Sequence, residues 1–537
     1  MLPFPNQTIY HGLSAVTDDR PDAPALVFED DTWSYADVLD ESRELAGGLA
    51  DLGVEAGDTV AVWLSNRPAW VTTTLAASAL GAAVVAVNTR YRADELAYML
   101  DDAGCRVLVT ESTFLGTNHL ERLAEIVPSV RTAAPDTFDP EGFDLEAVVA
   151  VDGDDLTGYD AVRRYDDVRR RGDSSVEAID DAETPAAVFY TSGTTGDPKG
   201  CLQPSRSLLN HSANALEHLG VESSDTVLGT LPFPGIWGFN VWLGTLARGA
   251  TLVVQSHFTP EETARLVDAH DVTCFPGLAT MFTRTFDAEG DGWTASLERG
   301  AVGFLTLSYE EALFERIEDK LGFPLVQPYG LSEANSMIFV GRPDAPLSVR
   351  KRVGGPLVSE AIEAKIVDPD TGERRPEGEK GELWLRGYNV MVGYLGAPEK
   401  TAEAVDDDGW LRTGDVCSRD GERLEFHSRL DDALRVRGFL VSPREIEQAI
   451  DAVAGVSQSQ VVGVDHDRHG QIPVAFVRRD DHDLDARALH DALAERIADY
   501  KLPERIEFVE SFPRSEGPHG AKIQKHELRE RARTLDV

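Results

Sequence analysis

Short apolar runs that can form strands alternate with amphipathic runs that can form helices along most of this chain. Residues 59–64 and 83–87 predict buried strands, and residues 70–80 between them predict a helix. Alternation of this kind is typical of α/β proteins, in which helices pack in layers around largely parallel sheets. Further strands are predicted at 106–110, 186–189, 247–254, 272–276 and 325–328, and further helices at 93–102, 260–269 and 309–321.

Three regions depart from this alternation. Residues 362–386 have short β runs between GER, PEG and EKG turns, which predicts a small antiparallel sheet or barrel. Residues 136–183 are rich in Asp and weakly periodic, so most of that span is expected to be loop or surface insertion. After Ser428 a compact α+β tail is expected, with helices at 444–452 and 486–498 and strands at 459–464 and 473–479.

The predicted fold class is therefore α/β, with two domains. Residues 1–430 form a large N-terminal domain of layered α/β sheets plus a small β-barrel-like subdomain, and residues 431–537 form a small α+β C-terminal domain. The length of 537 residues agrees with about three to four folding units at ~100–200 residues each.

The charge balance excludes some partners. The chain has 51 Lys and Arg against 93 Asp and Glu, a net charge of −42, so nucleic acid and acidic membrane surfaces would be repelled. Only nine of the basic residues are lysines, and the acidic excess is spread along the chain. A dense carboxylate surface stays soluble at high salt, which favours a halophilic source over an ordinary acidic cytosolic protein.

Four scattered cysteines form no CxxC pair, so neither a disulfide framework nor a zinc site is indicated. The first residues lack the basic and apolar regions of a secretion signal. The longest apolar stretch, 75–87, is too short to span a bilayer. A soluble, cytoplasmic protein is expected.

A loop rich in glycine and hydroxyl groups follows the predicted strand at 186–189. It reads Tyr190-Thr-Ser-Gly-Thr-Thr-Gly-Asp-Pro-Lys-Gly200, and a helix is predicted near Ser205, so a strand-to-helix junction is expected. Glycines let backbone N–H groups approach an anion, and Lys199 adds a positive charge. These features indicate a polyphosphate-binding loop over a simple surface turn, although no Walker A ending is present. The residues expected to bind phosphate are Thr191, Ser192, Gly193, Thr194, Thr195, Gly196 and Lys199.

With this loop the chain resembles the adenylate-forming superfamily of acyl-CoA synthetases, peptide-synthetase adenylation domains and luciferases. The resemblance covers nearly the whole chain and keeps the family's motif order. The further motifs are Tyr329-Gly-Leu-Ser-Glu333, Gly381-Glu-Leu-Trp-Leu-Arg-Gly387, Asp408-Gly-Trp-Leu-Arg-Thr-Gly-Asp415, Arg429-Leu-Asp-Asp432 and Gly438-Phe-Leu-Val-Ser-Pro-Arg-Glu-Ile-Glu447.

The resemblance implies roles for the residues of the YGLSE motif. A carboxylate must attack the α-phosphate of ATP, so the site needs a divalent metal and cations to neutralise charge. Glu333 resembles the family's Mg²⁺ carboxylate, with the Thr194 hydroxyl nearby, because Mg²⁺ takes few protein ligands beside phosphates. The alternative for Glu333 is a helix-capping role after Ser332. Tyr329 would stack on adenine, and Ser332 would donate to the α-phosphate.

Two later motifs complete the nucleotide site by resemblance. Asp415 would accept hydrogen bonds from both ribose hydroxyls, since a carboxylate only accepts. Arg429 would contact ribose or phosphate, or, as the alternative, form a surface salt bridge with Asp431 or Asp432. Asp431 matches the hinge about which the family's C-terminal domain swings between two half-reactions.

The C-terminal lysine departs from the family pattern. The chain reads Pro513-Arg-Ser-Glu-Gly-Pro-His-Gly-Ala-Lys522-Ile-Gln-Lys525, with extra residues before the lysine. Lys522 is still assigned the catalytic role, because a compact ammonium can bridge the substrate carboxylate and the α-phosphate. Lys525 is the alternative.

The acyl pocket departs from the family pattern as well. Gly303-Phe-Leu-Thr-Leu-Ser308 replaces a usual run of small residues, and Gly235 stands where relatives often carry His or an aromatic residue. Gly330 follows the adenine-stacking position, where acetate-using relatives carry Trp. The expected pocket residues are Gly235, Trp237, Phe304 and Gly330, with Phe239, Trp242, Leu305 and Leu307 as further walls.

The sequence thus predicts an AMP-forming carboxylate–CoA ligase, an acid–thiol ligase acting on a fatty or other apolar acid longer than acetate. Its expected small-molecule partners are the acid, ATP, Mg²⁺ and coenzyme A, with no nucleic acid. Two alternatives stay open: transfer of the acyl group to a carrier protein, and a nucleotide-binding homologue without turnover. The oligomeric state also stays open, a homodimer being one option.

Overall fold

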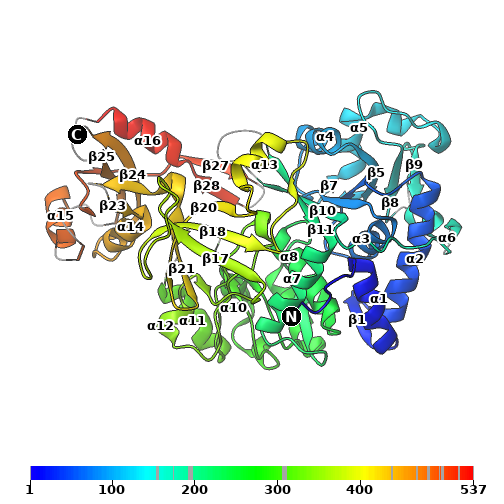
Figure 1. The fold of residues 1–537 in the computed structure, drawn as a ribbon, viewed down its shortest axis with the longest axis horizontal. Helices are drawn as coiled ribbons and strands as arrows, with labels where there is room; N and C mark the ends of the chain where they lie inside the picture. The colour runs from blue at the N-terminus through cyan, green and yellow to red at the C-terminus, as the bar shows by residue number, and fades with distance from the viewer. Residues whose placement is uncertain are drawn as a thin grey trace.

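The structure is a computed structural model that describes residues 2–152, 156–172, 175–191, 198–304, 311–436, 439–466, 470–480, 484–494, 496–497, 501–517 and 520–535. Figure 1 shows a large lobe, coloured blue to yellow along the chain, and a small orange-to-red lobe at one end. The predicted α/β class, with a large N-terminal and a small C-terminal domain, is confirmed.

An eight-stranded sheet forms the centre of the first half of the chain. Six neighbouring strands, namely β10, β4, β3, β5, β8 and β9, are parallel, and β11 and β19 add an antiparallel edge beside β10. Both faces are buried: Val60 and Val62 pack into one hydrophobic core, whereas Ala61 and Trp63 pack into a second core on the other face. In spatial order the strands are β19 (Gly393–Tyr394), β11 (Lys199–Pro204), β10 (Pro185–Thr191), β4 (Ala83–Ala86), β3 (Thr59–Trp63), β5 (Cys105–Thr110), β8 (Ala147–Ala150) and β9 (Val162–Arg164).

A second, four-stranded sheet lies beside the first. Its strands β12 (Thr226–Gly229), β13 (Thr251–Val254) and β1 (Pro24–Phe28) are parallel, and β2 (Asp31–Ser34) closes it antiparallel. The helices around the two sheets are α1 (Ile9–Asp19), α2 (Tyr35–Asp51), α3 (Pro68–Leu80), α4 (Ala93–Asp102), α5 (His119–Ile126), α6 (Tyr165–Arg171), α7 (Ser205–His218), α8 (Ile236–Ala247), α9 (Pro260–Ala269), α10 (Ala279–Glu289), α11 (Glu311–Leu321), α12 (Leu347–Arg350) and α13 (Pro398–Ala404).

Several predicted strands are corrected by the structure. Most of residues 136–183 is loop as expected, but the span also contains β8, β9 and α6, and β8 is fully buried between β5 and β9, so this span is part of the main sheet. Residues 247–250 end α8 and turn at Gly249 (φ 73°), so β13 begins only at Thr251. Residues 272–276 and 325–328 contribute isolated bridges at Cys274 and Val326 and no continuous strand, since their neighbours pair for one residue only.

The region predicted as a small antiparallel sheet is confirmed as one of five strands. Their spatial order is β16 (Gly354–Gly355), β21 (Arg423–Arg429), β20 (Leu411–Asp420), β18 (Gly381–Gly387) and β17 (Ile362–Val367). A turn of 3₁₀ helix at Leu430–Asp432 leads from β21 into the C-terminal sheet. That sheet and its helices comprise β22 (Leu434–Val436), β23 (Phe439–Val441), α14 (Pro443–Asp451), β24 (Val456–His466), β25 (Gly470–Arg479), α15 (Ala486–Ala494), β26 (Arg505–Phe508) and α16 (Lys525–Arg533).

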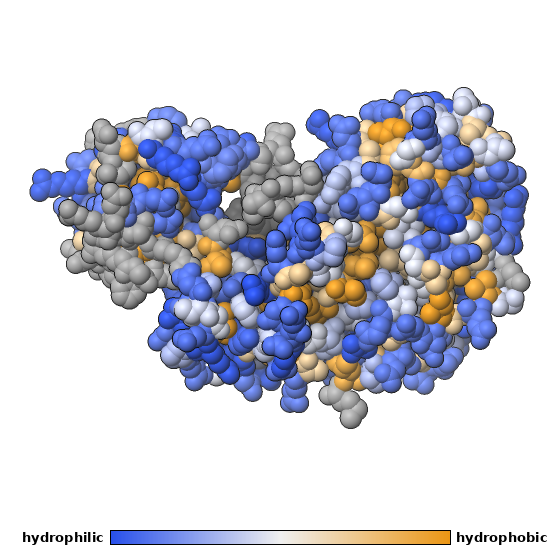
Figure 2. All heavy atoms as spheres, turned by 45° about the horizontal axis from the view of Figure 1, so that its top comes forward, coloured by the Kyte–Doolittle hydropathy of each residue, from blue (hydrophilic) through white to orange (hydrophobic). Residues whose placement is uncertain are grey.

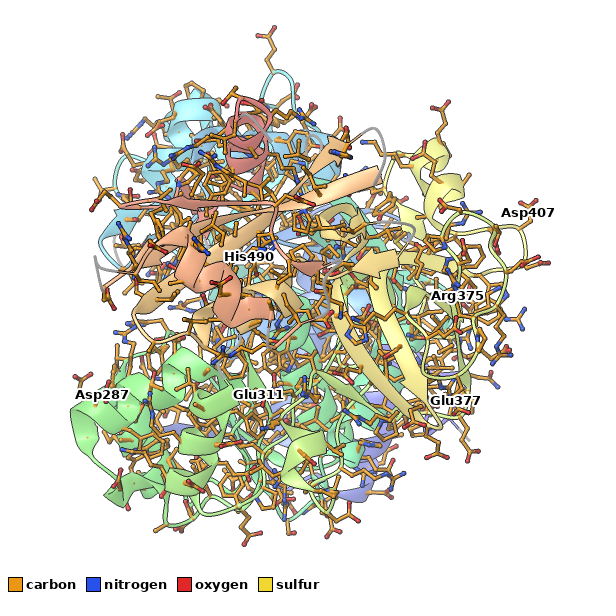
Figure 3. All side chains as sticks on the ribbon, turned by 90° about the vertical axis from the view of Figure 1, so that its left-hand side faces the viewer. Asp287, Glu311, Arg375, Glu377, Asp407 and His490 are labelled. Carbon is orange, nitrogen blue, oxygen red and sulfur yellow. The ribbon has the colours of Figure 1, made fainter. Side chains whose placement is uncertain are left out.

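The surface is dominated by polar side chains. Hydrophilic residues (blue) cover most of the face drawn in Figure 2, with small apolar patches between them. In Figure 3 the carboxylates of Asp287, Glu377 and Asp407 point away from the ribbon, and all three residues are exposed. Among the described residues, no helix combines the length and apolar character needed to cross a bilayer.

Candidate active site

A cavity of about 360 Å³ lies where the loops of the large domain meet the five-stranded sheet and α14. One part of its wall is apolar and includes Trp237, Leu278, Val302 and Phe304. The other part is polar, with the side chains of Gln327, Tyr329, Asp415, Arg429 and Arg444. This division suits a ligand with an apolar portion and a polar, charged portion.

Asp415 is the centre of the polar part. It is 3 % exposed, and its Oδ2 accepts a hydrogen bond of 2.6 Å from the Tyr329 hydroxyl. Its Oδ1 lies 2.8 Å from Nη1 of Arg429. Asp415 and Arg429 are direct partners across β20 and β21, so the register of the sheet brings the pair together. Arg429 thus forms an ion pair with Asp415, whereas the side chain of Asp431, an alternative partner, lies outside the described residues.

Burial raises the pKa of the Asp415 carboxyl to about 6 from its usual 3.8. The positive charge of Arg429 and the hydrogen bond from Tyr329 oppose this rise, and the negative charge of Glu333 adds to it. The carboxylate therefore lacks some of the solvation that water would give it. Two further hydrogen-bond donors from a ligand would replace the hydrogen bonds from water that the buried carboxylate lacks.

The glycine-rich loop joins two antiparallel strands. Thr191 in β10 is paired with Lys199 in β11, so the loop is the turn of a hairpin and the expected strand-to-helix junction is wrong. The helix does begin at Ser205, but β11 precedes it. Ser192, Gly193, Thr194, Thr195 and Gly196 lie outside the described residues.

Lys199 and Glu333 meet around one tyrosine. The Tyr394 hydroxyl donates to Glu333 Oε1 at 2.9 Å, and Nζ of Lys199 lies 5.0 Å from the centre of the Tyr394 ring. Burial, together with the charge of Glu333, raises the pKa of Tyr394, so its hydroxyl stays protonated and donates. Ser332 and Glu333 form a single 3₁₀ turn (Ser332–Ala334), and Gln203 from β11 donates to the Ser332 carbonyl at 2.7 Å. The hairpin of β10 and β11 and the YGLSE motif are thus directly connected.

Gly330 makes a close backbone approach. A Cβ atom at this position would lie 2.3 Å from the carbonyl carbon of Ser336 and 2.4 Å from the nitrogen of Met337. Asn335, Ser336 and Met337 all have positive φ (65°, 52° and 38°), which places them in a tight left-handed turn against Gly330. Although Gly330 lines the cavity, any side chain there would strike backbone before reaching the acyl region, so it does not act as an open pocket floor.

The apolar wall differs from its predicted composition. Trp237 and Phe304 line the cavity, whereas Phe239 and Trp242 are fully buried in the core around Trp70. The described residues that line the cavity do not include Gly235, which is the N-cap of α8, while Leu305 and Leu307 lie outside the described residues. The ring of Trp237 lies so close to Gly303 that a Cβ there would be 2.5 Å from it.

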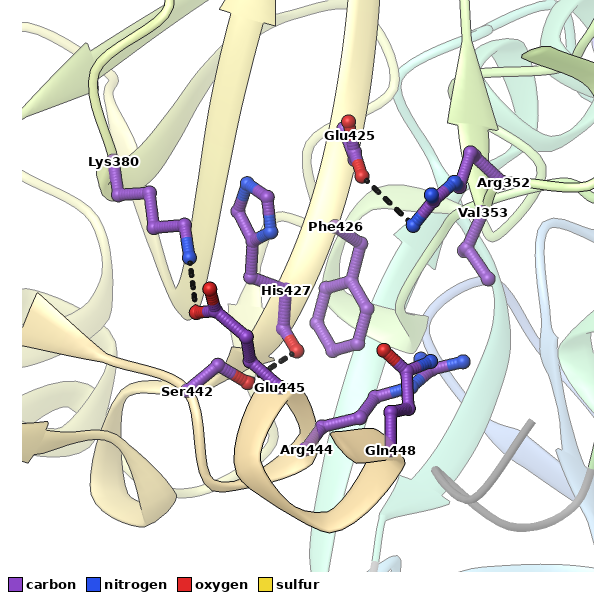
Figure 4. Close-up of a pocket in the computed structure, with 10 residues that line it drawn as sticks. All are labelled: Arg352, Val353, Lys380, Glu425, Phe426, His427, Ser442, Arg444, Glu445 and Gln448. Atoms are coloured by element: carbon purple, nitrogen blue, oxygen red, sulfur yellow. Dashed lines mark hydrogen bonds and ion pairs between the residues drawn. The ribbon is translucent and has the colours of Figure 1, made fainter. Parts of the chain in front are cut away.

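A smaller cavity of about 190 Å³ adjoins the first and lies between the two domains (Figure 4). Val353, Phe426 and Arg444 belong to both cavities. Across it, Nζ of Lys380 lies 3.0 Å from Oε2 of Glu445, and the Ser442 hydroxyl donates to the His427 carbonyl at 3.0 Å. These contacts join α14 to the five-stranded sheet.

Comparison with known proteins identifies the family. The family of AMP-binding enzymes matches residues 13–395, and the AMP-binding enzyme C-terminal domain matches residues 445–517. The chain belongs to the AMP-binding enzyme family. It is an acid–thiol ligase that uses ATP, Mg²⁺ and coenzyme A.

Relatives extend along almost the whole ligase. It is 34 % identical to the 3-[(3aS,4S,7aS)-7a-methyl-1,5-dioxo-octahydro-1H-inden-4-yl]propanoyl:CoA ligase of Mycobacterium tuberculosis, over 98 % of this chain and 99 % of the relative. It is 30 % identical to the mitochondrial medium-chain acyl-CoA ligase of Rattus norvegicus, over 98 % and 87 %. ATP-bound MatB from Rhodopseudomonas palustris has the same fold, with a TM-score of 0.81, 27 % identity and coverage of 98 % and 99 %.

The residues around Glu333 fit a magnesium ion held mainly by substrate. No group of three or more His, Cys, Asp or Glu side chains that could hold a metal occurs among the residues that the structure describes. Oε1 of Glu333 accepts a hydrogen bond from the Tyr394 hydroxyl, and a carboxylate has further acceptor sites for a ligand. Mg²⁺ typically takes one or two protein carboxylates beside phosphates and waters, so a lone Glu suits it. The capping alternative fails, since Leu331 is the N-cap of this turn and no side chain caps it.

The extra residues before Lys522 form a hairpin in the ligase. Arg514 and Ser515 in β27 (Arg514–Gly517) pair with Ile523 and Lys522 in β28 (Gly520–Ile523). The side chains of Lys522 and of Asp431 lie outside the described residues. Lys525, in contrast, has its Nζ 3.1 Å from Oε1 of the buried Glu447, which also accepts from the Val461 amide at 2.8 Å.

The sequence reasoning missed Tyr394 and Arg444 as site residues of the ligase. Arg444 lies inside the motif at 438–447 that contributes to the family resemblance, and Tyr394 lies seven residues after the motif that ends at Gly387. Only the pairing of β19 with β11 brings Tyr394 next to Lys199, and only the docking of α14 brings Arg444 to the cavity. Periodicity along the chain carries no signal for either contact.

The close approach at Gly330 leads to a prediction. Gly330→Ala should destabilise the ligase by about 1–3 kcal/mol, because the backbone at 336–337 must move, and should lower kcat/KM for every acid by a similar factor. Gly235→Ala is the matched control, since its Cβ would meet only the Pro232 carbonyl oxygen at 3.3 Å. Melting temperatures and rates with several acids check both variants. Wild-type stability with a changed acid preference in Gly330→Ala would assign Gly330 to acyl selection.

Proposed function

We propose that this ligase activates an apolar carboxylic acid longer than acetate, with a short- or medium-chain optimum. The observation that carries the proposal is the apolar wall of the main cavity, where Trp237, Leu278, Val302 and Phe304 present no charged side chain. Each CH₂ group buried there would contribute ~0.8 kcal/mol, about a fourfold gain in kcat/KM. Phe304 is bulky and would limit the length over which this gain continues. The names of the two relatives, a medium-chain acyl-CoA ligase and a ligase for a bicyclic propanoyl acid, agree with an acid of this class.

The reaction takes place in two half-reactions at one cavity. A carboxylate oxygen of the acid attacks the α-phosphorus of ATP, the bond to the β-phosphate oxygen breaks, and pyrophosphate leaves. The sulfur of coenzyme A then attacks the acyl carbon of the adenylate, loses its proton to solvent, and displaces AMP. Bound Mg²⁺ would neutralise phosphate charge during the first step.

The site residues divide these tasks. Tyr329 contributes an aromatic face for adenine, and Asp415 accepts from the ribose hydroxyls while Arg429 neutralises it. Lys199 and the hairpin residues from Thr191 to Gly196 would hold the β- and γ-phosphates. Ser332 would donate to the α-phosphate, and Glu333, with Thr194, would hold Mg²⁺. The hydrogen bonds from Tyr394 to Glu333 and from Gln203 to the Ser332 carbonyl keep this part of the site together.

The C-terminal domain would change position between the two half-reactions. The proposed boundary at 430/431 falls inside the 3₁₀ turn Leu430–Asp432 and between the two regions matched by the family comparisons, which supports Asp431 as the hinge. Half-exposed side-chain contacts across the second cavity, such as the ion pair of Lys380 with Glu445, could be exchanged at low cost.

The composition supports a halophilic, cytoplasmic enzyme. A net charge of −42 and the exposed acids seen in Figure 3 would repel one another at low ionic strength. Salt at ~1 M reduces the screening length to ~3 Å and removes most of that repulsion. A homodimer is compatible with this proposal and is not required by it.

A panel of acids tests the proposed function. Acids from acetate to palmitate, plus benzoate, are offered with ATP, Mg²⁺ and coenzyme A, and AMP and acyl-CoA are measured at low and molar salt. We expect kcat/KM to rise from propionate to a short- or medium-chain optimum and then to fall, with activity and melting temperature higher at molar salt. Preference for acetate would overturn the substrate proposal, and full stability at low salt would overturn the halophilic one. Adenylate without thioester would point to a carrier-protein acceptor, and no pyrophosphate release to a non-catalytic homologue.

Lys522 should be needed for adenylation and much less for thioester formation. Lys522→Ala should lower acid-dependent pyrophosphate exchange by ~10²–10³ through loss of charge stabilisation in the transition state. Lys525→Ala is the matched control: it breaks the ion pair with Glu447, so it should lower stability with little effect on exchange per folded molecule. The reverse result, an inactive Lys525→Ala enzyme beside a normal Lys522→Ala enzyme, would move the catalytic role to Lys525.

The raised pKa of Asp415 predicts a pH-dependent KM for ATP. In the free enzyme the pKa of Asp415 is about 6, above its usual 3.8. Ionisation of this carboxyl therefore lowers the free energy of unfolding as pH rises from 3.8 to about 6. The ribose hydroxyls offset this loss by donating to the ionised carboxylate. The ionised fraction falls as pH falls below about 6, so KM for ATP should rise, by about tenfold at pH 5. Asp415→Asn should have a high KM without this inflection. An identical pH profile in Asp415→Asn would show that the nucleotide itself causes the dependence.

A further inference from the structure

Asn66 connects the carboxyl ends of both parallel sheets. It follows β3 of the eight-stranded sheet, and it is 2 % exposed. Its Nδ2 donates to the carbonyl of Leu231 at 2.9 Å. The same nitrogen lies 3.2 Å from the carbonyl of Gly229, the last residue of β12, and 3.1 Å from that of Gln255, which follows β13. Its Oδ1 accepts from the Phe233 amide at 2.8 Å. The nitrogen and the oxygen of the Asn66 amide are therefore both bound to the backbone of residues 229–233, and the nitrogen also lies near Gln255.

The position of Asn66 is itself fixed by a buried carboxylate. Glu111, at the end of β5, is fully buried and accepts from the Ser65 amide at 2.6 Å and from the Ser65 hydroxyl at 3.0 Å. It also pairs with Nη2 of Arg67 at 2.8 Å. The residues on each side of Asn66 are thus held to the neighbouring strand, which leaves the Asn66 side chain little freedom.

The loop held by Asn66 carries the acyl wall. Residues 230–235 lead directly into α8, whose first turn contains Trp237. The loop packs tightly on that turn, since a Cβ at Gly238 would lie 2.1 Å from the Pro232 carbonyl oxygen. Trp237 in turn lies against Gly303 and lines the cavity. Moving the loop would therefore move the Trp237 ring.

We propose that Asn66 is a positioning residue for acyl selectivity, which holds the 229–235 loop so that Trp237 forms a fixed wall of the cavity. The proposal rests on the proposed use of this cavity for the acyl group. A wall held rigidly discriminates between acids that differ by one or two CH₂ groups, whereas a wall that can shift accepts them more equally. The hydrogen bonds of the Asn66 side chain go to backbone at Gly229, Leu231, Phe233 and Gln255, and Asn66 is not among the described residues that line the cavity, so its effect on ATP use should be small.

The experiment compares two buried asparagines. Asn66→Asp keeps an acceptor for Phe233 and replaces the donor with a charge that faces three carbonyls. Asn210→Asp is the matched control, because Asn210 is also fully buried and binds backbone at both ends, but of Phe4 and Arg206, away from the acyl loop. Asn66→Ser, neutral and smaller, is the milder variant if Asn66→Asp folds poorly. The measurements are kcat/KM across the acid panel, KM for ATP, and amide hydrogen exchange of residues 229–240.

We expect both Asn66 variants to reduce, by about threefold to tenfold, the ratio of kcat/KM between the best acid and an acid two carbons shorter. KM for ATP should stay within about twofold, and exchange at 229–240 should accelerate. Asn210→Asp should change neither the ratio nor this exchange. Equal loss of kcat/KM for all acids, with exchange no faster than in Asn210→Asp, would overturn the positioning role. If the wild type uses no acid, the proposed function fails, and the hydrogen-exchange comparison still decides whether Asn66 holds the loop.

Discussion

The buried carboxylate of Asp415 connects the parts of this site that come from different regions of the chain. Its two oxygens bind Tyr329, which belongs to the large domain's loop region, and Arg429, which ends the last strand before the C-terminal domain. Because burial raises the pKa of this carboxyl, the free enzyme keeps an incompletely solvated charge in place before the substrate arrives. A charge held in this way needs no reorganisation when a ligand supplies hydrogen-bond donors, which is the advantage of a preorganised polar site.

The cavity also depends on backbone geometry that few residues can adopt. Gly330 lies against the left-handed turn at 335–337, and Asn335 in that turn donates to the Ser207 hydroxyl at 2.5 Å and is fully buried. His211 in α7 lies 2.7 Å from the Ser336 carbonyl. Hydrogen bonds with α7, the helix that follows β11, therefore stabilise this left-handed turn. Side chains of the YGLSE motif are positioned by contacts that the motif itself does not contain.

Much of the fold could be predicted from the sequence because its strands are buried on both faces. Runs such as 59–63 and 83–86 are almost wholly apolar, and the helices between them have clear periodicity. The prediction of strands failed where the apolar run was short or lay among polar residues. β8 is four residues long inside an Asp-rich span, and Cys274 and Val326 pair for a single residue each. β11 was missed because its run, 199–204, has two residues, Lys199 and Gln203, that favour neither strand nor core in isolation.

The candidate site was less predictable, since its side chains are brought together by tertiary contacts. Motif residues such as Asp415 and Tyr329 could be named from the sequence, but their mutual hydrogen bond could not. Phe239 and Trp242 were expected to line the pocket beside Trp237, yet they face the core, because residues two and five positions further along a helix lie on a different face from Trp237. A helix presents different residues to the cavity and to the interior, and only the docking of α8 decides which.

The few lysines of this arginine-rich chain mostly form specific contacts, in contrast to the many acidic residues spread over its surface. Lys320, Lys351, Lys380, Lys501 and Lys525 each pair with a carboxylate, and Lys199 and Lys365 each lie over aromatic rings. Seven of the nine lysines therefore have a defined partner. If lysine is kept where a compact ammonium is needed, its presence at 522, at the end of a hairpin that lengthens the family's usual segment, is better explained by a required contact than by chance. Because Lys525 already pairs with Glu447, Lys522 stays our proposed catalytic lysine, and its side chain lies outside the described residues.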